Sequence, residues 1–173
     1  MYGGLSTELL WKPVDSRLGL GVELNYVAKR DSDMAFGFDE FDYDVFTGQL
    51  SAYYDLGNGY HTQLDVGQYL AGDIGATLSV DREYDNGIKI GAYFTQTDLS
   101  YEDFGDGSYN KGVRILIPQD FFNGTPTRDG YGTTIRTRSG DGGAQLNVSG
   151  RLYGFVRDAH TQDLSDTWGR FWR

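Results

Sequence analysis

The chain has 173 residues, a formal net charge of −10 and no cysteine. This length suits one domain or part of a larger one. The acidic balance argues against nucleic-acid binding, which needs clustered Lys and Arg, and the lack of cysteine excludes disulfides and Cys-based metal or redox sites. The 25 glycines and the 15% of aromatic residues favour strands and tight turns.

The clearest pattern is an alternation of apolar and other residues from Arg17 to Lys29. One face carries Leu18, Leu20, Val22, Leu24, Tyr26 and Ala28, and the other carries Arg17, Gly19, Gly21, Glu23, Asn25, Val27 and Lys29. A period of two predicts a β-strand. The predicted strand is longer than the five or six residues usual in soluble proteins, and it exceeds the roughly nine to eleven that a tilted strand needs to cross a bilayer.

The same alternation recurs along the chain. Seven strands are predicted, over residues 5–11, 17–29, 46–54, 60–67, 76–84, 88–95 and 113–117, and weaker patterns cover 131–138 and 147–157. No segment has a helical period, and no apolar run approaches the about 18 residues of a transmembrane helix. The chain is therefore expected to be all-β over 1–173, as a single domain.

The connections between the predicted strands differ in length. Asn58-Gly59 and Asn86-Gly87 are expected to form type I′ hairpin turns, since both dipeptides tolerate φ > 0. Short connections at 13–16, 57–59 and 85–87 alternate with long ones at 30–43 and 98–109, although 71–73 is brief. Short turns at one end and long loops at the other are typical of outer-membrane barrels.

Two architectures fit these strands. The first is an antiparallel up-and-down meander that forms an outer-membrane β-barrel or part of one, and the alternative is a soluble β-sandwich that binds carbohydrate. In the barrel, Leu18, Leu20, Val22 and Leu24 face outwards, whereas Glu23 and Asn25 face a lumen. The barrel is favoured by aromatic residues near strand ends, where they resemble a membrane-interface girdle: Tyr2, Trp11, Tyr26, Tyr54, Tyr60 and Tyr84.

Four stretches carry a resemblance to a known family: Leu5–Arg17 with Leu24–Val27, Gly67–Thr77, Gly105–Gly112 with Ile117-Pro118, and either Arg128–Gly130 or Asp141–Leu146, of which the second fits better. They resemble the YjbH/GfcD family of exopolysaccharide- and capsule-associated outer-membrane (lipo)proteins, of which the chain is similar to the C-terminal part. The resemblance implies a β-barrel in the bacterial outer membrane and a non-enzymatic role in polysaccharide export or assembly. It also implies three partners, namely an extracellular polysaccharide, outer-membrane lipid and other export proteins.

The ends of the chain bear on this resemblance. Residues 1–5 do not have the basic and apolar regions of a signal peptide, so the chain is expected to be a fragment without its leader. Residues 167–173 resemble the aromatic C-terminal strand signal of outer-membrane proteins but end in Arg173.

Five residues are candidates for polysaccharide contact. Tyr53, Tyr69 and Tyr93 offer rings that can stack on sugars, and Gln63 and Asp65 add polar groups nearby. The alternative is that these tyrosines only fill the interior of a small barrel. The stacking hypothesis predicts that replacing all three tyrosines by Ala reduces polysaccharide secretion or binding.

Other chemistry has weaker signals. The acidic residues of 30–43 could bind calcium, but no EF-hand pattern fits, and a solvated loop explains them. Asp65 and Asp81 could form a glycosidase pair, and Gly105–Gly112 could bind an anion, but acids on a lumen face and a tight loop re-entering a strand are the favoured explanations. His61 and His160 lie far apart in sequence and no nucleophile motif is found. No catalytic residue, metal or cofactor is expected.

Overall fold

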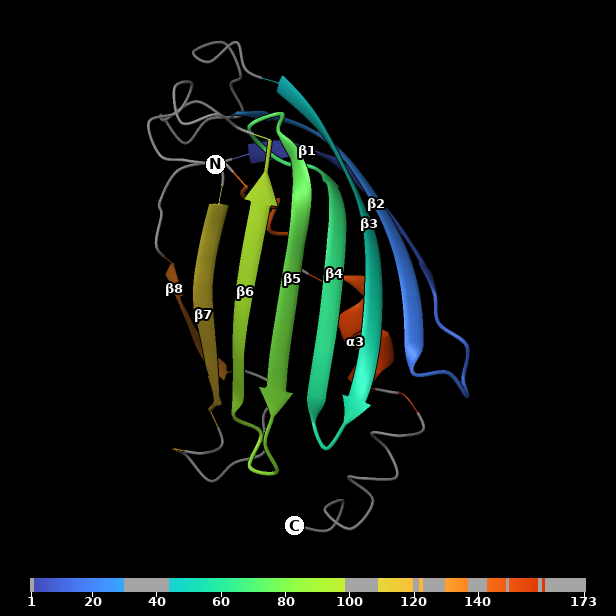
Figure 1. The fold of residues 1–173 in the computed structure, drawn as a ribbon, viewed down its shortest axis with the longest axis vertical. Helices are drawn as coiled ribbons and strands as arrows, with labels where there is room; N and C mark the ends of the chain where they lie inside the picture. The colour runs from blue at the N-terminus through green and yellow to red at the C-terminus, as the bar shows by residue number, and fades with distance from the viewer. Residues whose placement is uncertain are drawn as a thin grey trace.

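A computed structural model describes residues 2–29, 44–98, 109–119, 122, 130–136, 143–148, 150–158 and 160. Its strands form one sheet in chain order, with every neighbouring pair antiparallel. They are β1 (Tyr2–Trp11), β2 (Leu18–Lys29), β3 (Asp44–Gly57), β4 (Tyr60–Gln68), β5 (Ile74–Glu83), β6 (Lys89–Thr97), β7 (Tyr109–Pro118) and β8 (Gly130–Arg136). The predicted all-β, up-and-down meander is confirmed (Figure 1).

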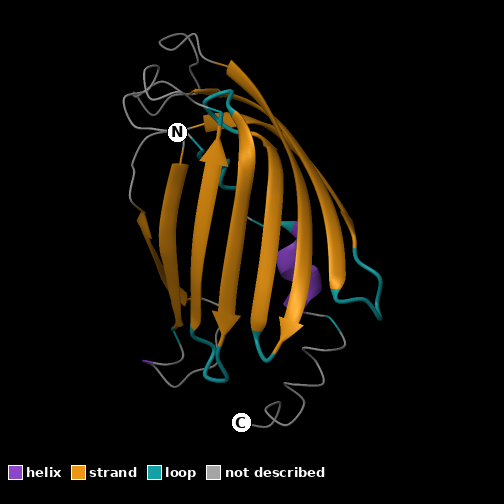
Figure 2. Ribbon diagram, in the orientation of Figure 1, coloured by secondary structure: helices purple, strands orange, loops and turns teal. Residues whose placement is uncertain are grey.

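The sheet is curved, and Figure 2 shows the helix α3 (Leu152–Asp158) on its inner side. The weak strand pattern at 147–157 was therefore a wrong prediction, because 152–158 is helical. Its apolar and polar residues match neither period clearly, so contacts decide the conformation. Among the described residues, no helix is both long and apolar enough to cross a membrane.

The first Asn-Gly hairpin has the predicted geometry. Asn58 and Gly59 have φ of 54° and 75°, as a type I′ turn requires at both central positions. The register shifts between Asp55 and Gly57, and Gly57 has φ of 81°. This bulge and the turn together reverse the chain between β3 and β4.

The second hairpin differs from its prediction. Asn58 is the one described non-glycine residue with positive φ, so Asn86 cannot occupy a type I′ turn. Instead, Gly87 N–H donates to Tyr84 O (2.8 Å), and Gly87 takes φ of 80°. Asp85 lengthens the loop, so Gly87 alone supplies the left-handed residue that follows a type I turn. The position of the hairpin is right, but its turn type is not.

The described connections partly test the expected alternation of lengths. The short ones, 12–17, 58–59 and 84–88, lie at one end of the sheet, because consecutive strands run antiparallel. Residues 69–73 form the brief connection at the opposite end. The long connection 30–43 and most of 98–109 lie outside the described residues, and so do 105–108 of Gly105–Gly112 and residues 167–173. The calcium-binding hypothesis, which concerns 30–43, therefore also falls outside the described residues.

The two faces of the sheet differ in polarity. We call the face turned away from α3 the convex face and the face toward α3 the concave face. On β2, Leu18, Leu20, Val22 and Leu24 are exposed on the convex face, while Glu23 and Asn25 are buried on the concave face. The predicted orientation of β2 is thus confirmed.

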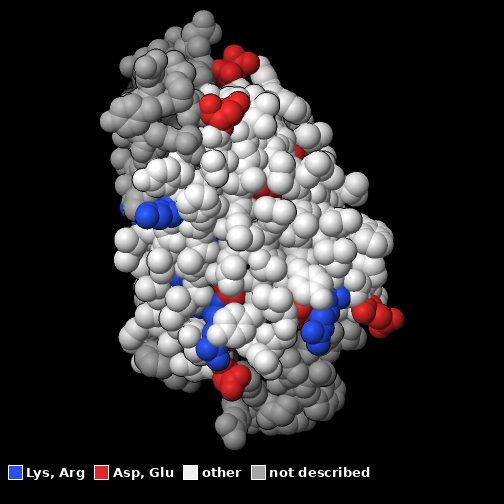
Figure 3. Space-filling model, in the orientation of Figure 1, with Lys and Arg blue, Asp and Glu red and all other residues white. Residues whose placement is uncertain are grey.

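This polarity is the reverse of that in a soluble domain. Among the described residues, fourteen polar or charged side chains are buried but only five apolar ones. A small apolar cluster of Val27, Val45 and Leu70, against which Ala144 and Leu146 pack, is the hydrophobic core. Figure 3 shows the convex side as largely uncharged across its middle, apart from a basic patch at its left edge, and most of the other charged residues lie toward the two ends.

The sheet is not closed into a barrel within the described residues. In this part of the chain, β1 pairs only with β2, and β8 pairs only with β7. A β-sandwich needs a second sheet to cover one apolar face. The described strands form one sheet, and its apolar side chains are exposed rather than packed on another layer.

Candidate functional site

The concave face is crossed by residues 143–148 and 150–158, which we call the inner segment. Its N-terminal part is tied to the 69–73 connection, since Gly143 N–H donates to Asp73 Oδ2 (2.9 Å) and Leu70 N–H donates to Ala144 O (3.1 Å). At its other end, Arg157 pairs with Glu83 of β5 (3.2 Å). These contacts span much of the sheet, so the inner segment is held at several points.

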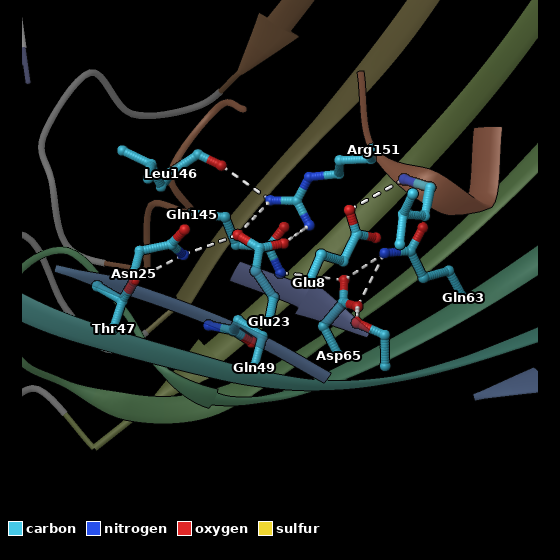
Figure 4. A network of polar contacts seen from close by, with 12 residues as sticks. Glu8, Glu23, Asn25, Thr47, Gln49, Gln63, Asp65, Gln145, Leu146 and Arg151 are labelled. Carbon is cyan, nitrogen blue, oxygen red and sulfur yellow. Dashed lines mark hydrogen bonds and ion pairs between the residues drawn. The ribbon is translucent and has the colours of Figure 1, made fainter. Parts of the chain in front are cut away.

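Two acids on neighbouring strands bind this segment, one by an ion pair and one by a hydrogen bond. Glu8 of β1 and Glu23 of β2 lie directly opposite in the register, an arrangement that destabilises a sheet when both are charged. Arg151 forms an ion pair with Glu23 and also donates to Leu146 O (2.9 Å). The Leu152 N–H, at the start of α3, donates to Glu8 Oε2 (2.9 Å). Because both carboxylates bind the inner segment, their mutual repulsion is offset (Figure 4).

Asp65 of β4 is a further residue of the sheet that binds the inner segment. It is 2% exposed and accepts hydrogen bonds from Ser51 Oγ (2.6 Å), Gln63 Nε2 (2.8 and 2.9 Å) and Gln145 Nε2 (3.0 Å). Ser51 and Gln63 belong to β3 and β4, whereas Gln145 belongs to the inner segment (Figure 4). Burying a carboxylate is costly unless it is hydrogen-bonded, and these donors supply that compensation.

Two of the three predicted sugar-stacking tyrosines are buried by the chain itself. Tyr53 is 3% exposed, and its ring stacks on Tyr153 of α3 with centroids 3.8 Å apart and planes 9° apart. Tyr69 is fully buried, and its hydroxyl hydrogen-bonds Thr77 Oγ1 (2.6 Å). Burial raises the pKa of Tyr69 to about 12. Neither ring offers a free face to a polymer in this arrangement.

Tyr93 and Gln63 line a cavity of about 610 Å³ between the inner segment and the concave side of β4–β8. The wall combines hydroxyl, amide and guanidinium groups with two aromatic rings and the apolar side chains of Ala144, Leu146 and Val148. Its side chains from the sheet are Gln63, Thr77, Ser79, Tyr93, Thr95, Asn110, Arg114, Thr134 and Arg136, and those from the inner segment include Gln145, Asn147, Arg151 and Phe155. The predicted set thus divides between this cavity and its buried surroundings.

The sequence prediction missed the basic residues of this site. Arg114 and Arg136 lie on the concave side of β7 and β8, and their inward direction follows from alternation with Val113 and Ile135. That signal was present in the sequence. Gln145 and Arg151 had no such signal, because the inner segment lacks a period.

The geometry also bears on the catalytic alternatives. In the β4–β5 register Asp65 faces Thr77 and Asp81 faces His61, so the two acids lie about 13 Å apart along the sheet. Paired glycosidase acids are about 5–9.5 Å apart. Asp81 instead binds Arg114 Nη2 (2.9 and 3.1 Å). Among the described residues no cluster of three His, Asp or Glu could hold a metal ion.

Known proteins that are similar to this chain indicate its family. A family model described as "Exopolysaccharide biosynthesis protein YbjH" matches residues 1–158. The Escherichia coli (strain K12) protein named "Uncharacterized lipoprotein YjbH" is 40% identical over 163 residues, which cover 91% of this chain and 23% of that protein. The chain therefore spans less than a quarter of that relative's length. No solved structure matches. The extent of these matches shows that the chain belongs to the YjbH family of exopolysaccharide biosynthesis proteins.

Proposed function

We propose that this chain is a lipid-facing β-barrel segment of the bacterial outer membrane that serves, without catalysis, in export or assembly of an extracellular polysaccharide. The family description supports the polysaccharide role, and the name of the E. coli relative, a lipoprotein, supports membrane association. The observation that carries the proposal is the exposed apolar band on the convex face. Such a band is stable against lipid, whereas in water it favours aggregation.

The band has the layout of a membrane-facing β-surface. Aliphatic side chains fill its middle, and aromatic rings stand at both ends. The aliphatic residues are Leu20, Val22, Leu24, Leu50, Leu64, Val66, Leu78, Val80, Ile90, Val113 and Ile135; Trp11, Tyr54, Tyr60 and Tyr84 lie toward the short-turn end, and Tyr26, Phe46, Phe94 and Tyr109 toward the other.

The height of the band suits a bilayer. On β3, Phe46 and Tyr54 belong to opposite aromatic rows, and the strand between them extends about 26 Å at about 3.3 Å per residue. A tilt of about 40° reduces this to about 20 Å, close to the apolar band of about 25 Å in outer-membrane barrels. Arg82, whose guanidinium lies 4.8 and 4.5 Å from the ring centroids of Tyr60 and Tyr84, belongs to the interfacial row.

The unpaired edges support closure by further strands. A strand edge cannot face hydrocarbon with unsatisfied N–H and C=O groups. In the proposed membrane setting, β1 and β8 must therefore pair with strands outside the described residues. The polar concave face then lies toward the interior, where it meets the polymer and the other export proteins.

The test compares one substitution at two depths of β3. Leu50 (61% exposed) lies midway between the aromatic rows, and Leu56 (52% exposed) lies beyond Tyr54. Leu50→Arg is expected to abolish outer-membrane insertion and polysaccharide secretion, because Arg costs about 2–4 kcal/mol at the midplane and about 0–1 near the interface. Leu56→Arg should retain both. Membrane fractionation and secreted polymer are measured, and normal insertion of both variants rejects the proposal.

A further inference from the structure

We propose that the cavity under the inner segment binds an acidic saccharide, with Tyr93 as the ring platform and Arg136 as the group that recognises a carboxylate. This inference rests on the proposed polysaccharide role and adds the chemical class of the ligand. Three independent features of the cavity wall carry it: the position of the Tyr93 ring, the charge of the wall and an unsatisfied buried amide.

The Tyr93 ring leans from β6 across β7. Gly112 lies opposite Tyr93 in the register, and a Cβ at Gly112 would lie 2.6 Å from Tyr93 Cε1. Glycine at this position therefore leaves the space that the ring occupies. Tyr53 has a similar position over Gly21, but Tyr153 covers its other face. Tyr93 is only partly buried and lines the cavity, where the Arg114 guanidinium lies 5.8 Å from its ring centroid. No ring of the described residues stacks on Tyr93, so it is the tyrosine of the three that a sugar can contact.

The wall is basic in a chain that is acidic. Its described lining contains Arg114, Arg136 and Arg151 and no Asp or Glu, although the whole chain carries a net charge of −10. Arg114 is neutralised by Asp81 and Arg151 by Glu23. No carboxylate of the described residues pairs with Arg136. The described wall therefore retains one uncompensated positive charge, which favours an anionic ligand.

Polar groups for neutral hydroxyls lie beside this charge. Asn110 is 5% exposed and lines the cavity, and its buried Oδ1 has no hydrogen-bond partner among the described residues. Buried polar atoms are normally satisfied, so Oδ1 is an acceptor available to a ligand hydroxyl. Arg114 uses Nη2 for Asp81 and has further N–H donors. Sugar hydroxyls, a carboxylate and an apolar ring face together match this wall.

The ligand that satisfies all three features is a uronic-acid-containing saccharide. Its carboxylate accepts from Arg136, its hydroxyls donate to Asn110 Oδ1, and the apolar face of a sugar ring contacts Tyr93. A neutral saccharide satisfies the last two but leaves the arginine unused. We therefore expect the cavity to prefer acidic over neutral polymer, with a preference that weakens at high salt.

The experiment uses the full chain in detergent micelles and two probes, a galacturonic acid hexamer and its carboxyl-reduced galactose counterpart. Isothermal titration calorimetry is expected to show about tenfold tighter binding of the acidic hexamer at low salt. Arg136→Gln should reduce its affinity about fivefold and leave the neutral hexamer unchanged. Tyr93→Ala should weaken both probes, and Tyr93→Phe should retain both.

Arg82→Gln is the matched control, because it removes the same charge from the interfacial row outside the cavity. Equal affinity for the two hexamers, or equal losses from Arg136→Gln and Arg82→Gln, overturns the inference, and so does a lack of binding to either probe. If circular dichroism shows that the Arg136→Gln variant does not fold, the Arg136→Lys variant, which keeps the charge, is titrated with the two hexamers in its place. The proposed membrane role is judged separately by insertion of the Leu50→Arg variant, so the two failures are distinguishable.

Discussion

The two faces of the sheet use the same strands for opposite purposes. On the convex face, Leu20 and Leu50 are exposed, with exposed fractions of 44% and 61%. On the concave face, Glu23 and Asp65 are almost fully buried and bind the inner segment. The convex face therefore depends on what surrounds the molecule, while the concave face depends on specific partners within it. Substitutions on the two faces should differ in kind as well as in size.

The largest expected effect is on the convex face. Leu20→Arg should destabilise the inserted protein by about 2–4 kcal/mol, because an arginine is placed against lipid. Glu23→Ala should still insert but should release the inner segment, since Arg151 loses its carboxylate. Unfolding of liposome-inserted protein measures the first effect, and limited proteolysis near residue 151 measures the second. Indistinguishable behaviour of the two variants contradicts the comparison.

On the concave face, Arg151→Leu should cost about 1–3 kcal/mol in unfolding free energy. The change removes the ion pair to Glu23 and leaves this carboxylate facing Glu8 across the β1–β2 register. Adding Glu23→Gln should recover part of the loss, because the uncompensated charge is gone. A double-mutant cycle by denaturant unfolding measures this coupling, and additive effects show that the pair is not coupled.

A smaller effect is expected where an aromatic pair joins the two layers. Tyr153→Ala should weaken docking of α3 by about 0.5–1.5 kcal/mol beyond the loss of buried area, since its ring stacks on Tyr53. Tyr153→Phe keeps the stacked ring and serves as the control. Hydrogen exchange of α3 amides reports docking, and unchanged protection in the Ala variant argues against a role for the stack.

The last expected effect appears only at alkaline pH. Burial raises the pKa of Tyr69 to about 12 from 10.0, so its neutral form is favoured by folding. The contribution of Tyr69 to the free energy of unfolding is fully present below about pH 10 and is lost as the pH rises toward 12. Tyr69→Phe should remove this decline at the cost of the hydrogen bond to Thr77. Spectrophotometric titration and unfolding between these pH values test it, and equal pH dependence of both proteins refutes it.

The structure also changes how the tyrosine hypothesis is best tested. Tyr53 and Tyr69 are buried against the chain itself, so replacing them together with Tyr93 perturbs folding as well as any sugar contact. Tyr93 alone, with Phe as the conservative variant, separates the two roles. The prediction that aromatic stacking supports secretion stays open.

The fold followed largely from local pattern. Alternation placed seven strands and the direction of Leu20 and Glu23, because a strand's side chains point to opposite faces by geometry alone. Asn58-Gly59 determined a type I′ turn, since both residues adopt positive φ. At Asn86-Gly87 the same dipeptide formed a different turn, because five residues (84–88) separate the strand ends there, against two (58–59) at the first hairpin.

The candidate site followed from tertiary structure. The sequence by itself determined which residues share a face, and hence that Tyr93, Gln63 and Asp65 lie on the inner side. It did not determine that 152–158 is helical, or that Arg151 reaches Glu23 from 128 positions away in the chain. Periodicity encodes direction relative to a strand, whereas ion pairs and stacking between distant segments depend on how the chain returns across the sheet. That return buries Tyr53 and leaves Tyr93 at the cavity.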